Sequence, residues 1–223
     1  MPTTLITGAN RGIGLALAAH HAARGEHVIG VCRQSSRELA ALGVRVESGV
    51  DVTDLATLAA LRERLADIAI DRLILNAGVL HKESLGALDA AAFEHMRRQF
   101  EINALGPLRV VEALHSNLRV GSKIGIITSR MGSIADNGSG GYYGYRMSKA
   151  AVNAAGKSLA EDLRSRGIAV FMLHPGYVST AMTGHSGDIT PEQAAANLTA
   201  RLDELDLGQT GTFWHANGQP LPW

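Results

Sequence analysis

The sequence predicts an α/β fold, a doubly wound parallel sheet of about seven strands with helices on both faces. Short β-branched runs alternate with Ala- and Leu-rich amphipathic stretches along the whole chain, which is the pattern of repeated βαβ units. Glycine is in excess, with 25 of 223 residues, and the excess lies at the ends of the expected strands. No repeat, low-complexity tract or Pro/Ser-rich linker divides the chain, so we expect one domain over residues 1–223.

In the first half of the chain the β-branched runs are short enough for buried strands. The stretches between several of these runs place apolar residues at helical spacing. In order, we expect a strand at 3–7, a helix at 13–24, strands at 28–32 and 44–50, a helix at 55–66 and a strand at 73–76.

The second half continues the same alternation. Thr190, Pro191 and Gln193 mark a helix start, because they combine an N-cap, a proline at the first helical position and a capping-box glutamine. The expected elements are helices at 90–100 and 104–117, a strand at 124–128, a helix at 143–165, a strand at 168–173, a helix at 191–205 and an edge strand at 212–215.

The composition excludes several classes of protein. Lys and Arg number 21, as do Asp and Glu, so the net charge is zero and a nucleic-acid or anionic-membrane partner is not expected. The apolar runs are far shorter than the roughly 18 residues of a membrane span. The first residues lack the basic region and the small-residue cleavage site of a signal peptide. We therefore expect a cytoplasmic protein.

Cys32 is the sole cysteine, so no intrachain disulfide can form. Neither cysteine pairs nor HExxH spacing indicate a zinc site, and no metal is expected. The apolar run around Cys32 predicts a buried strand residue rather than a reactive thiol.

A glycine-rich turn joins the first strand to the first helix, with the sequence Thr7-Gly8-Ala9-Asn10-Arg11-Gly12-Ile13-Gly14. Its spacing is GxxxGxG rather than the GxGxxG of many dinucleotide sites. Glycines allow the backbone to approach a pyrophosphate closely, and a helix start directs free N–H groups and the positive end of its dipole at phosphates. The alternative is that the glycines serve ordinary helix–strand packing.

The end of the second strand indicates which dinucleotide such a turn would bind. NAD-specific sites carry an Asp or Glu there for the ribose 2′-hydroxyl, but this chain has Arg33. Arg33 and Arg11 offer two guanidinium groups for a 2′-phosphate, which favours NADP(H). The alternative is that both are solvated surface arginines.

Tyr145 and Lys149 are four residues apart in an expected helix and therefore share one face. A nearby ammonium favours the phenolate and lowers the pKa of a phenol, which makes it a usable acid and base near neutral pH. This spacing also occurs by chance on helix surfaces, so its meaning depends on the rest of the chain.

The motifs occur in an order that resembles the short-chain dehydrogenase/reductase family. They are Thr7-Gly8-xxx-Gly12-x-Gly14, Asp51-Val52, Asn76-Ala77-Gly78, Asn103, Ser129, Tyr145-xxx-Lys149 and Pro175-Gly176-Tyr177-Val178-Ser179-Thr180. The resemblance covers nearly the whole chain and implies a Rossmann fold. The run 140–149 and the ending Leu221-Pro222-Trp223 resemble the subgroup of C-factor-like and sniffer-type carbonyl reductases.

The resemblance implies four catalytic roles. Tyr145 would exchange a proton with the substrate oxygen, and Lys149 would lower the pKa of Tyr145 and bind the nicotinamide ribose. Ser129 would hold the carbonyl oxygen, and Asn103 would seat a water that links Lys149 to solvent. Ser133 is the alternative to Ser129, because both precede Tyr145 in the chain.

The resemblance also implies how the cofactor is held. The adenine would contact Asp51 and Val52, and the central part of the cofactor would lie along the Asn76–Gly78 turn. The nicotinamide end would lie against the segment 175–180. The full expected set is Gly8, Asn10, Arg11, Gly12, Ile13, Gly14, Arg33, Asp51, Val52, Asn76, Ala77, Gly78, Tyr145, Lys149, Pro175, Gly176, Val178 and Thr180.

The substrate side of the site is less defined. The short segment 181–189 suggests a compact or flexible substrate, or an open cleft. Residues placed to line a pocket, or alternatively to pack in ordinary loops, are His81, Met131, Tyr142, Tyr177, Met182 and His185. Apolar faces suggest a homodimer, through Leu105, Leu108 and Val111 on one helix and Ala151, Ala154 and Ala155 on another.

The sequence thus predicts an NADPH-dependent carbonyl reductase that acts on a small carbonyl compound. The alternative is an NADP(H)-binding sensor or signalling protein of the C-factor type with little or no turnover. A sugar-nucleotide epimerase would need a larger C-terminal substrate domain than 223 residues allow.

Overall fold

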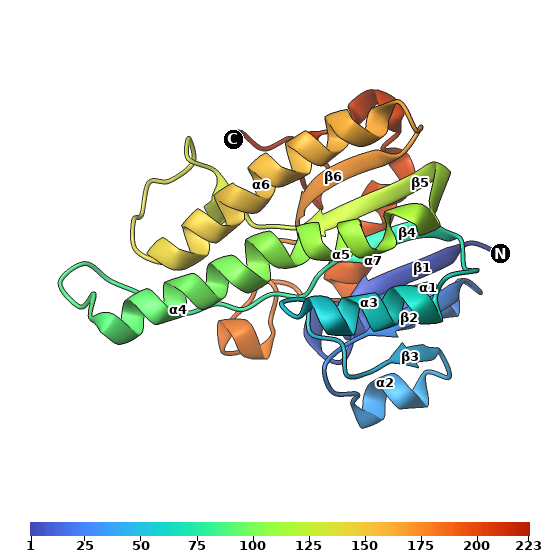
Figure 1. Ribbon diagram of the computed structural model, residues 1–223. Coiled ribbons are helices and arrows are strands. Elements are labelled where there is room, and N and C mark those ends of the chain that lie inside the picture. Colours follow the sequence, from blue (N-terminus) through green and yellow to red (C-terminus); the bar gives the residue numbers. More distant parts are fainter.

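The seven strands form one parallel sheet in the order β3-β2-β1-β4-β5-β6-β7 in the computed structural model, which describes all 223 residues (Figure 1). Every neighbouring pair is parallel. The predicted doubly wound α/β fold is therefore confirmed. The strands are β1 (Thr3–Thr7), β2 (His27–Val31), β3 (Arg45–Glu47), β4 (Ile70–Leu75), β5 (Leu118–Ile127), β6 (Ala169–His174) and β7 (Thr212–His215).

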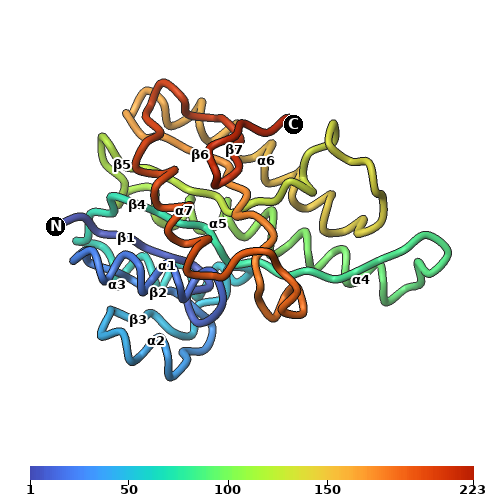
Figure 2. Tube along the Cα trace, turned by 180° about the vertical axis from the view of Figure 1, so that it is seen from behind, coloured from blue at the N-terminus to red at the C-terminus, as the bar shows by residue number.

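Helices cover both faces of the sheet. One face carries α3, α5 and α6, which lie in front of it in Figure 1, and α1 and α7 cover the opposite face, seen from behind in Figure 2. The helices are α1 (Gly12–Ala23), α2 (Arg37–Ala41), α3 (Leu55–Arg64), α4 (Ala90–Phe100), α5 (Gly106–Leu114), α6 (Tyr143–Arg164) and α7 (Pro191–Glu204). None of them combines the length and apolar character needed to cross a membrane.

Each face of the sheet has its own apolar core, and β1 shows how the sequence supplies both. Leu5 belongs to the core beneath α3, α5 and α6, whereas its neighbour Ile6 belongs to the core beneath α1 and α7. Both side chains are fully buried. Because successive side chains of a strand point to opposite faces, a strand covered on both sides needs a continuous apolar run.

Cys32 packs in the second of these cores, and burial raises the pKa of its thiol, which confirms the expected buried residue. The predicted capping box is also present: Thr190 Oγ1 accepts from the amide of Gln193 at 3.2 Å, and Gln193 Oε1 accepts from the amide of Thr190 at 2.9 Å.

Several boundaries differ from the sequence prediction. The short helix α2 was not predicted; it forms where Ser36 Oγ caps its start by accepting from the Leu39 amide. β5 begins at Leu118 rather than 124, because the buried Leu118 pairs with Ile70 of β4 before the register shifts between Ile70 and Arg72. The helix predicted over 104–117 is a π-helical turn, Glu101–Leu105, followed by the shorter α5.

The strand order reverses between β1 and β4, which continue into β2 and β5 on either side. In open parallel sheets, ligands bind outside the carboxyl ends of the strands at this point. The turns that follow β1, β4, β5 and β6 therefore meet at one edge, and they contain most of the expected site residues.

Candidate active site

The turn between β1 and α1 has the tight backbone conformation that its glycines predict. Gly8 and Gly12 have φ values of 68° and 54°, in the left-handed region that favours glycine. A Cβ on Gly14 would lie 2.2 Å from the carbonyl oxygen of Gly8, and a Cβ on Gly8 would lie 2.9 Å from the Cα of Ala77. Asn10 and Ile13 are half-buried in this turn, and Arg11 is exposed.

Asn76 braces this turn from the end of β4. Its Nδ2 donates to the carbonyl oxygens of Thr7 at 3.0 Å and Gly8 at 3.3 Å. Thr7 Oγ1 in turn accepts from the amides of Asn76 and Ala77. These bonds engage the Asn76 side chain, so it positions the glycine turn.

The N-terminus of α1 has the features of an anion site. Side chains cap the starts of α2, α3, α4 and α7, but α1 has no capping side chain and no acidic residue in its first turn. Its first N–H groups and the positive end of its dipole are therefore available to a phosphate. Thr180 closes the other side, with its Cγ2 3.5 Å from where a Cβ on Gly12 would lie. The residues present fit a dinucleotide pyrophosphate.

The segment from Pro175 to Thr180 leaves β6 and runs along the same edge. Pro175 and Val178 are buried, and Val178 forms a parallel bridge with Ile189. Gly176 has a φ of 96°, and a Cβ there would lie 3.1 Å from Ile189 Cδ1. The backbone of this segment is thus fixed beside the glycine turn.

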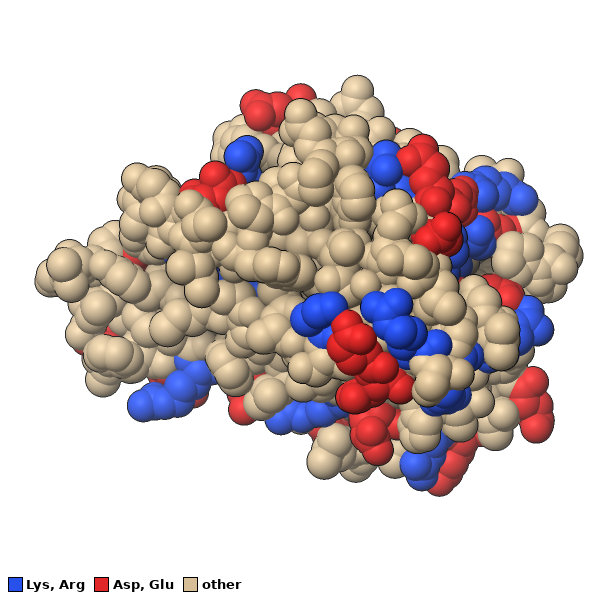
Figure 3. Space-filling view, turned by 90° about the horizontal axis from the view of Figure 1, so that it is seen from above, with Lys and Arg blue, Asp and Glu red and all other residues tan.

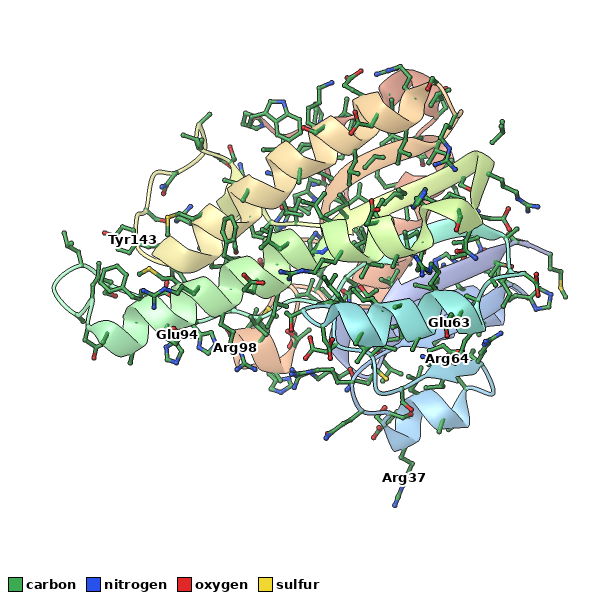
Figure 4. The ribbon with its side chains drawn as sticks, in the orientation of Figure 1. Arg37, Glu63, Arg64, Glu94, Arg98 and Tyr143 are labelled. Carbon is green, nitrogen blue, oxygen red and sulfur yellow. The ribbon has the colours of Figure 1, made fainter.

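Asp51 and Arg33 lie together beyond β3 and β2. An Arg33 guanidinium nitrogen is 4.0 Å from Asp51 Oδ2, and 58% of the Arg33 side chain is exposed. Partial burial raises the pKa of Asp51, but hydrogen bonds from Thr53 and the charges of Arg33 and Arg98 outweigh it and hold the pKa below its usual range. Arg98, on the lower side of α4 in Figure 4, was not predicted to face this region. Val52 packs 3.0 Å from where a Cβ on Gly106 would lie, against the start of α5.

Ser129, Tyr145 and Lys149 meet in a buried cluster. Their exposed fractions are 7%, 8% and 5%. The Ser129 side chain lies beside the Tyr145 phenol, where it acts to lower the pKa of that phenol. Lys149 Nζ lies 5.7 Å from the centroid of the Tyr145 ring, on the same face of α6, and donates to the carbonyl oxygen of Ile127 at 2.8 Å.

Burial dominates the protonation of this cluster. It raises the pKa of Tyr145 to about 12, with the Ser129 hydrogen bond acting in the opposite direction, and it lowers the pKa of Lys149 to about 8. The lowered phenol pKa that the resemblance implies is therefore not what the structure gives. The reason is that removal of the phenolate from water costs more than the Ser129 hydrogen bond returns.

The side chain of Ser133, the alternative to Ser129, makes its hydrogen bonds away from Tyr145. Its Oγ donates to the carbonyl oxygen of Trp223 at 3.0 Å and accepts from the amide of Asp136 at 3.1 Å. It therefore ties the loop after β5 to Trp223, and the geometry favours Ser129 as the partner of Tyr145.

Asn103 lies in the π-helical turn, an element that is frequent at functional sites. Its Oδ1 accepts from the Val79 amide at 2.8 Å, and its Nδ2 donates to the Val79 carbonyl and to Ser148 Oγ. A Cβ on Gly78 would lie 3.2 Å from Asn103 Oδ1 and 3.9 Å from Lys149 Nζ. Asn103 thus joins the turn after β4 to α6. That it also seats a water linking Lys149 to solvent stays a prediction.

The residues expected on the substrate side are spread along the rim. Tyr177 is 49% exposed and hydrogen-bonds Ser186, and Met182 is 45% exposed. His185 is exposed with a φ of 60°, and the His81 ring stacks on His95 with centroids 4.2 Å apart. No group of His, Cys, Asp and Glu side chains could hold a metal ion.

Met131 lines an apolar groove of about 280 Å³ together with Ile134, Tyr143, Met147 and Ala150. This groove lies on the opposite face of α6 from Tyr145, because positions 143, 147 and 150 are on the other side of the helix. Figure 3, the view from above, shows few charged side chains on its left half, where Figure 1 places the N-terminal end of α6. A larger cavity of about 680 Å³ is remote from the site, at the amino ends of the strands.

Sequence reasoning missed two buried polar residues beside the site, Glu83 and Gln99, which are 4% and 0% exposed. Gln99 Nε2 donates to Glu83 Oε1 at 2.6 Å, and the Gly144 amide donates to Glu83 Oε2 at 3.1 Å. Neither belongs to a motif, and their contacts span 16 and 61 residues of sequence.

His174, the last residue of β6, has its pKa lowered to about 3, chiefly by burial. The charges of His215, Arg130 and Lys149 act in the same direction, and Asp136 opposes them. The His174 ring packs edge-on against His215 with centroids 4.8 Å apart, and its Nδ1 has no hydrogen-bond partner.

Acid is therefore expected to destabilise the protein through His174. Its folded-state pKa lies below the ordinary 6.5, so the unfolded chain binds the proton more readily. The stability that neutral His174 contributes is complete above pH 6.5 and is lost as the pH falls toward 3. Melting temperatures measured from pH 7 to 4 should decline, and His174→Gln should flatten the decline. The exposed-site control His115→Gln should keep the original slope; an unchanged slope in both variants would assign the acid sensitivity to other groups.

Comparison with known proteins places the chain among enzymes of one family. A family model described as short chain dehydrogenase matches residues 2–190. The chain is 44% identical over 229 residues to a 1-hydroxy-2-glutathionyl-2-methyl-3-butene dehydrogenase of Rhodococcus sp. (strain AD45), and the match covers 100% of both proteins. It is 43% identical over 157 residues to C-signal of Myxococcus xanthus, covering 69% of this chain and 93% of that protein.

Solved carbonyl reductases share the fold over the whole chain. Carbonyl reductase Sniffer of D. melanogaster superposes with a TM-score of 0.89 at 27% identity, covering 100% of both chains. An NADPH-bound carbonyl reductase from chicken fatty liver also gives 0.89 at 27% identity, covering 100% of this chain and 99% of that one. The resemblance to the subgroup that contains C-factor-like and sniffer-type proteins is confirmed by these matches.

Proposed function

This chain belongs to the short-chain dehydrogenase family, and we propose that it transfers a hydride between NADP(H) and a small carbonyl or alcohol compound, with Tyr145 as general acid and base. When bound, the nicotinamide supplies or accepts the hydride. The observation that carries the proposal is the buried cluster of Ser129, Tyr145 and Lys149 at the carboxyl edge of the sheet.

In the reducing direction Tyr145 Oη gives its proton to the substrate oxygen. A phenol with a pKa of about 12 stays protonated at neutral pH. It is nevertheless a stronger acid than an alcohol, whose acidity is comparable with that of water. Proton transfer to an alkoxide from Tyr145 is therefore favourable.

Lys149 and Ser129 prepare Tyr145 for this step. With a pKa of about 8, Lys149 is mostly charged at pH 7, so its ammonium, 5.7 Å from the centroid of the Tyr145 ring, stabilises the phenolate that forms. One of its N–H groups is used by Ile127, which leaves two for a ribose hydroxyl. Ser129 Oγ accepts from the Met131 amide at 3.1 Å, which leaves its hydroxyl proton free to be donated to the phenol or the substrate oxygen.

The direct test is oxidation of NADPH and NADH with a panel of aldehydes, ketones and quinones. The reverse reaction is assayed with NADP⁺, NAD⁺ and small alcohols, and the alcohol named for the Rhodococcus relative, 1-hydroxy-2-glutathionyl-2-methyl-3-butene, is included. Turnover of a carbonyl or alcohol compound is expected. Failure of every compound in both directions would contradict the proposed activity.

The backbone of the glycine turn and of the segment Pro175–Thr180 would hold the diphosphate and the nicotinamide end. Arg33 and Arg11 would hold the 2′-phosphate. Support for NADP(H) comes from the exposed Arg33 guanidinium at the end of β2, from the lack of an acidic residue there, and from the NADPH-bound state of a similar structure.

Arg33→Ala is expected to raise the KM for NADPH by about 10- to 100-fold and to leave the KM for NADH unchanged, because a charge-assisted hydrogen bond contributes about 1.5–3 kcal/mol. The control is Arg37→Ala, which removes an arginine that points from α2 into solvent in Figure 4. Steady-state kinetics with both cofactors give the two KM values. Equal losses with NADPH and NADH, or no loss, would remove Arg33 from 2′-phosphate recognition.

A second candidate is a cofactor-binding signalling protein without turnover, and the observation that favours it is the 43% identity to C-signal. The buried Tyr145–Lys149 pair is an argument against it, because a pure sensor has no chemical need for a proton donor. The two candidates differ in one result: a sensor binds NADPH tightly and turns over no compound of the panel.

We also propose a homodimer in the cytoplasm. Val111, one of the residues expected in the interface, lies in the core beneath α5 and cannot take part. The exposed apolar side chains of α4 and α6, Phe93, Phe100 and Met147, are 41–53% exposed and are better candidates. Sedimentation of the wild-type protein beside Phe93→Ser and Met147→Ser gives the oligomeric state and tests this surface.

A further inference from the structure

Glu83 is a buried carboxylate without a salt-bridge partner. It lies in the segment between β4 and α4, is 4% exposed and forms no salt bridge. Burial of a charge is costly unless hydrogen bonds satisfy it. Its two oxygens accept from Gln99 Nε2 at 2.6 Å and from the Gly144 amide at 3.1 Å.

The start of α6 depends on Glu83 for its capping. Tyr142 stands at the N-cap position with a φ of 51°, in the left-handed region, and supplies no side-chain cap. Its amide donates to the carbonyl oxygen of Glu83 at 2.9 Å. Glu83 therefore satisfies two N–H groups at the entry of α6, and its negative charge lies at the positive end of that helix dipole.

The same contacts lock α4 against α6. A Cβ on Gly144 would lie 2.5 Å from Gln99 Nε2 and 2.8 Å from the Cα of Met96, so the two helices approach closely at this glycine. Gln99 Oε1 also accepts from the His81 amide at 2.9 Å. The segment after β4 is thus fastened to both helices.

A second polar link lies one turn further along α6. Asn103 Nδ2 donates to Ser148 Oγ at 3.1 Å, and Ser148 Oγ donates to the carbonyl oxygen of Tyr145 at 2.8 Å. The two links flank Tyr145, because one holds the residue before it and the other holds its own carbonyl. The first turn of α6 is thereby fixed in place and in direction.

We propose that Glu83 is a positioning residue for Tyr145, which holds the first turn of α6 through Gly144 and Tyr142 so that the phenol stays against Ser129. This inference rests on the proposed function for its kinetic consequence. Its structural consequence, a fixed Tyr145 ring, does not depend on turnover.

The pair Glu83 and Gln99 offers a test in which the hydrogen bonds can be broken and restored. Glu83→Gln places an amide donor opposite the Gln99 amide donor, so one bond is lost. Adding Gln99→Glu restores the network: the new carboxylate at position 99 accepts from the new amide at 83 and from the His81 amide. Glu94→Gln is the control, because Glu94 is an exposed residue of α4 that forms an ion pair with Arg97 (Figure 4).

With NADPH and the best carbonyl compound of the panel, Glu83→Gln is expected to lower kcat by about tenfold, because small misplacements of reacting groups are costly. The KM for NADPH should stay unchanged. The double variant Glu83→Gln/Gln99→Glu should recover kcat to within about threefold of the wild type, and Glu94→Gln should match the wild type.

The readout independent of turnover is the ¹³C-tyrosine NMR signal of Tyr145, assigned with Tyr145→Phe. We expect it to move or broaden in Glu83→Gln and to return in the double variant. A variant Glu83→Gln that melts at a lower temperature but keeps both kcat and the Tyr145 signal would overturn the inference and leave Glu83 a structural cap. If the wild type turns over no compound, the NMR pattern alone decides the inference and the proposed function fails separately.

Discussion

Tyr145→Phe is expected to lower kcat by about 10²- to 10⁴-fold, the usual contribution of a positioned general acid. The substitution removes Oη alone, and the phenyl ring keeps the packing of a side chain that is 8% exposed. The glycine turn and the Pro175–Thr180 segment are untouched. NADPH binding, followed by fluorescence titration, should therefore match the wild type while steady-state turnover falls.

The matched control is Tyr143→Phe, two residues earlier in α6 and on its outer face, where Tyr143 lines the apolar groove (Figure 4). It should keep wild-type kcat. If Tyr145→Phe retained more than about a tenth of the activity, another group would have to supply the proton.

Gly14→Ala is expected to abolish NADPH binding. An added Cβ would lie 2.2 Å from the Gly8 carbonyl oxygen and 2.5 Å from Asn76 Nδ2, and both atoms belong to the braced turn. The turn must move, because neither the backbone nor the hydrogen-bonded amide can yield without breaking the brace. We expect the Kd for NADPH to rise by at least about 100-fold and the free energy of unfolding to fall by about 1–3 kcal/mol, the usual cost of overpacking.

Gly138→Ala serves as the control for this substitution, because nothing lies within 4 Å of a Cβ at that loop position. Calorimetric titration with NADPH gives the Kd, and thermal unfolding gives the change in stability. Wild-type affinity in Gly14→Ala would show that the glycine turn does not contact the cofactor.

The fold could be predicted from the sequence because its main signals are local. The alternation of strands and helices, the apolar run of β1 and the capping box at Thr190 are each contained in a few consecutive residues. The features that were missed depend on contacts across the fold. The early start of β5 requires pairing with β4, and the π-helical turn at Glu101–Leu105, which was not predicted, is visible only in its backbone geometry.

The candidate site, like the fold, has a part that the sequence predicts and a part that it does not. The turns after β1, β4, β5 and β6 converge because strand order brings them to one edge, and their motifs are visible in the sequence. Glu83 and Arg98 could not be found, because each acts on residues far away along the chain. The pKa of Tyr145 could not be foreseen either, since it depends on how completely the surrounding fold buries the phenol.

The central claim is hydride transfer between NADP(H) and a carbonyl carbon. It is tested most directly with NADPH that carries deuterium at both C4 positions of the nicotinamide, incubated with the aldehydes and ketones of the panel and the wild-type protein, followed by mass spectrometry of the products. The account predicts an alcohol that carries deuterium on the former carbonyl carbon, and at least about 100-fold less of it with Tyr145→Phe over the same time. Products without deuterium, or equal labelling by the two proteins, would contradict it.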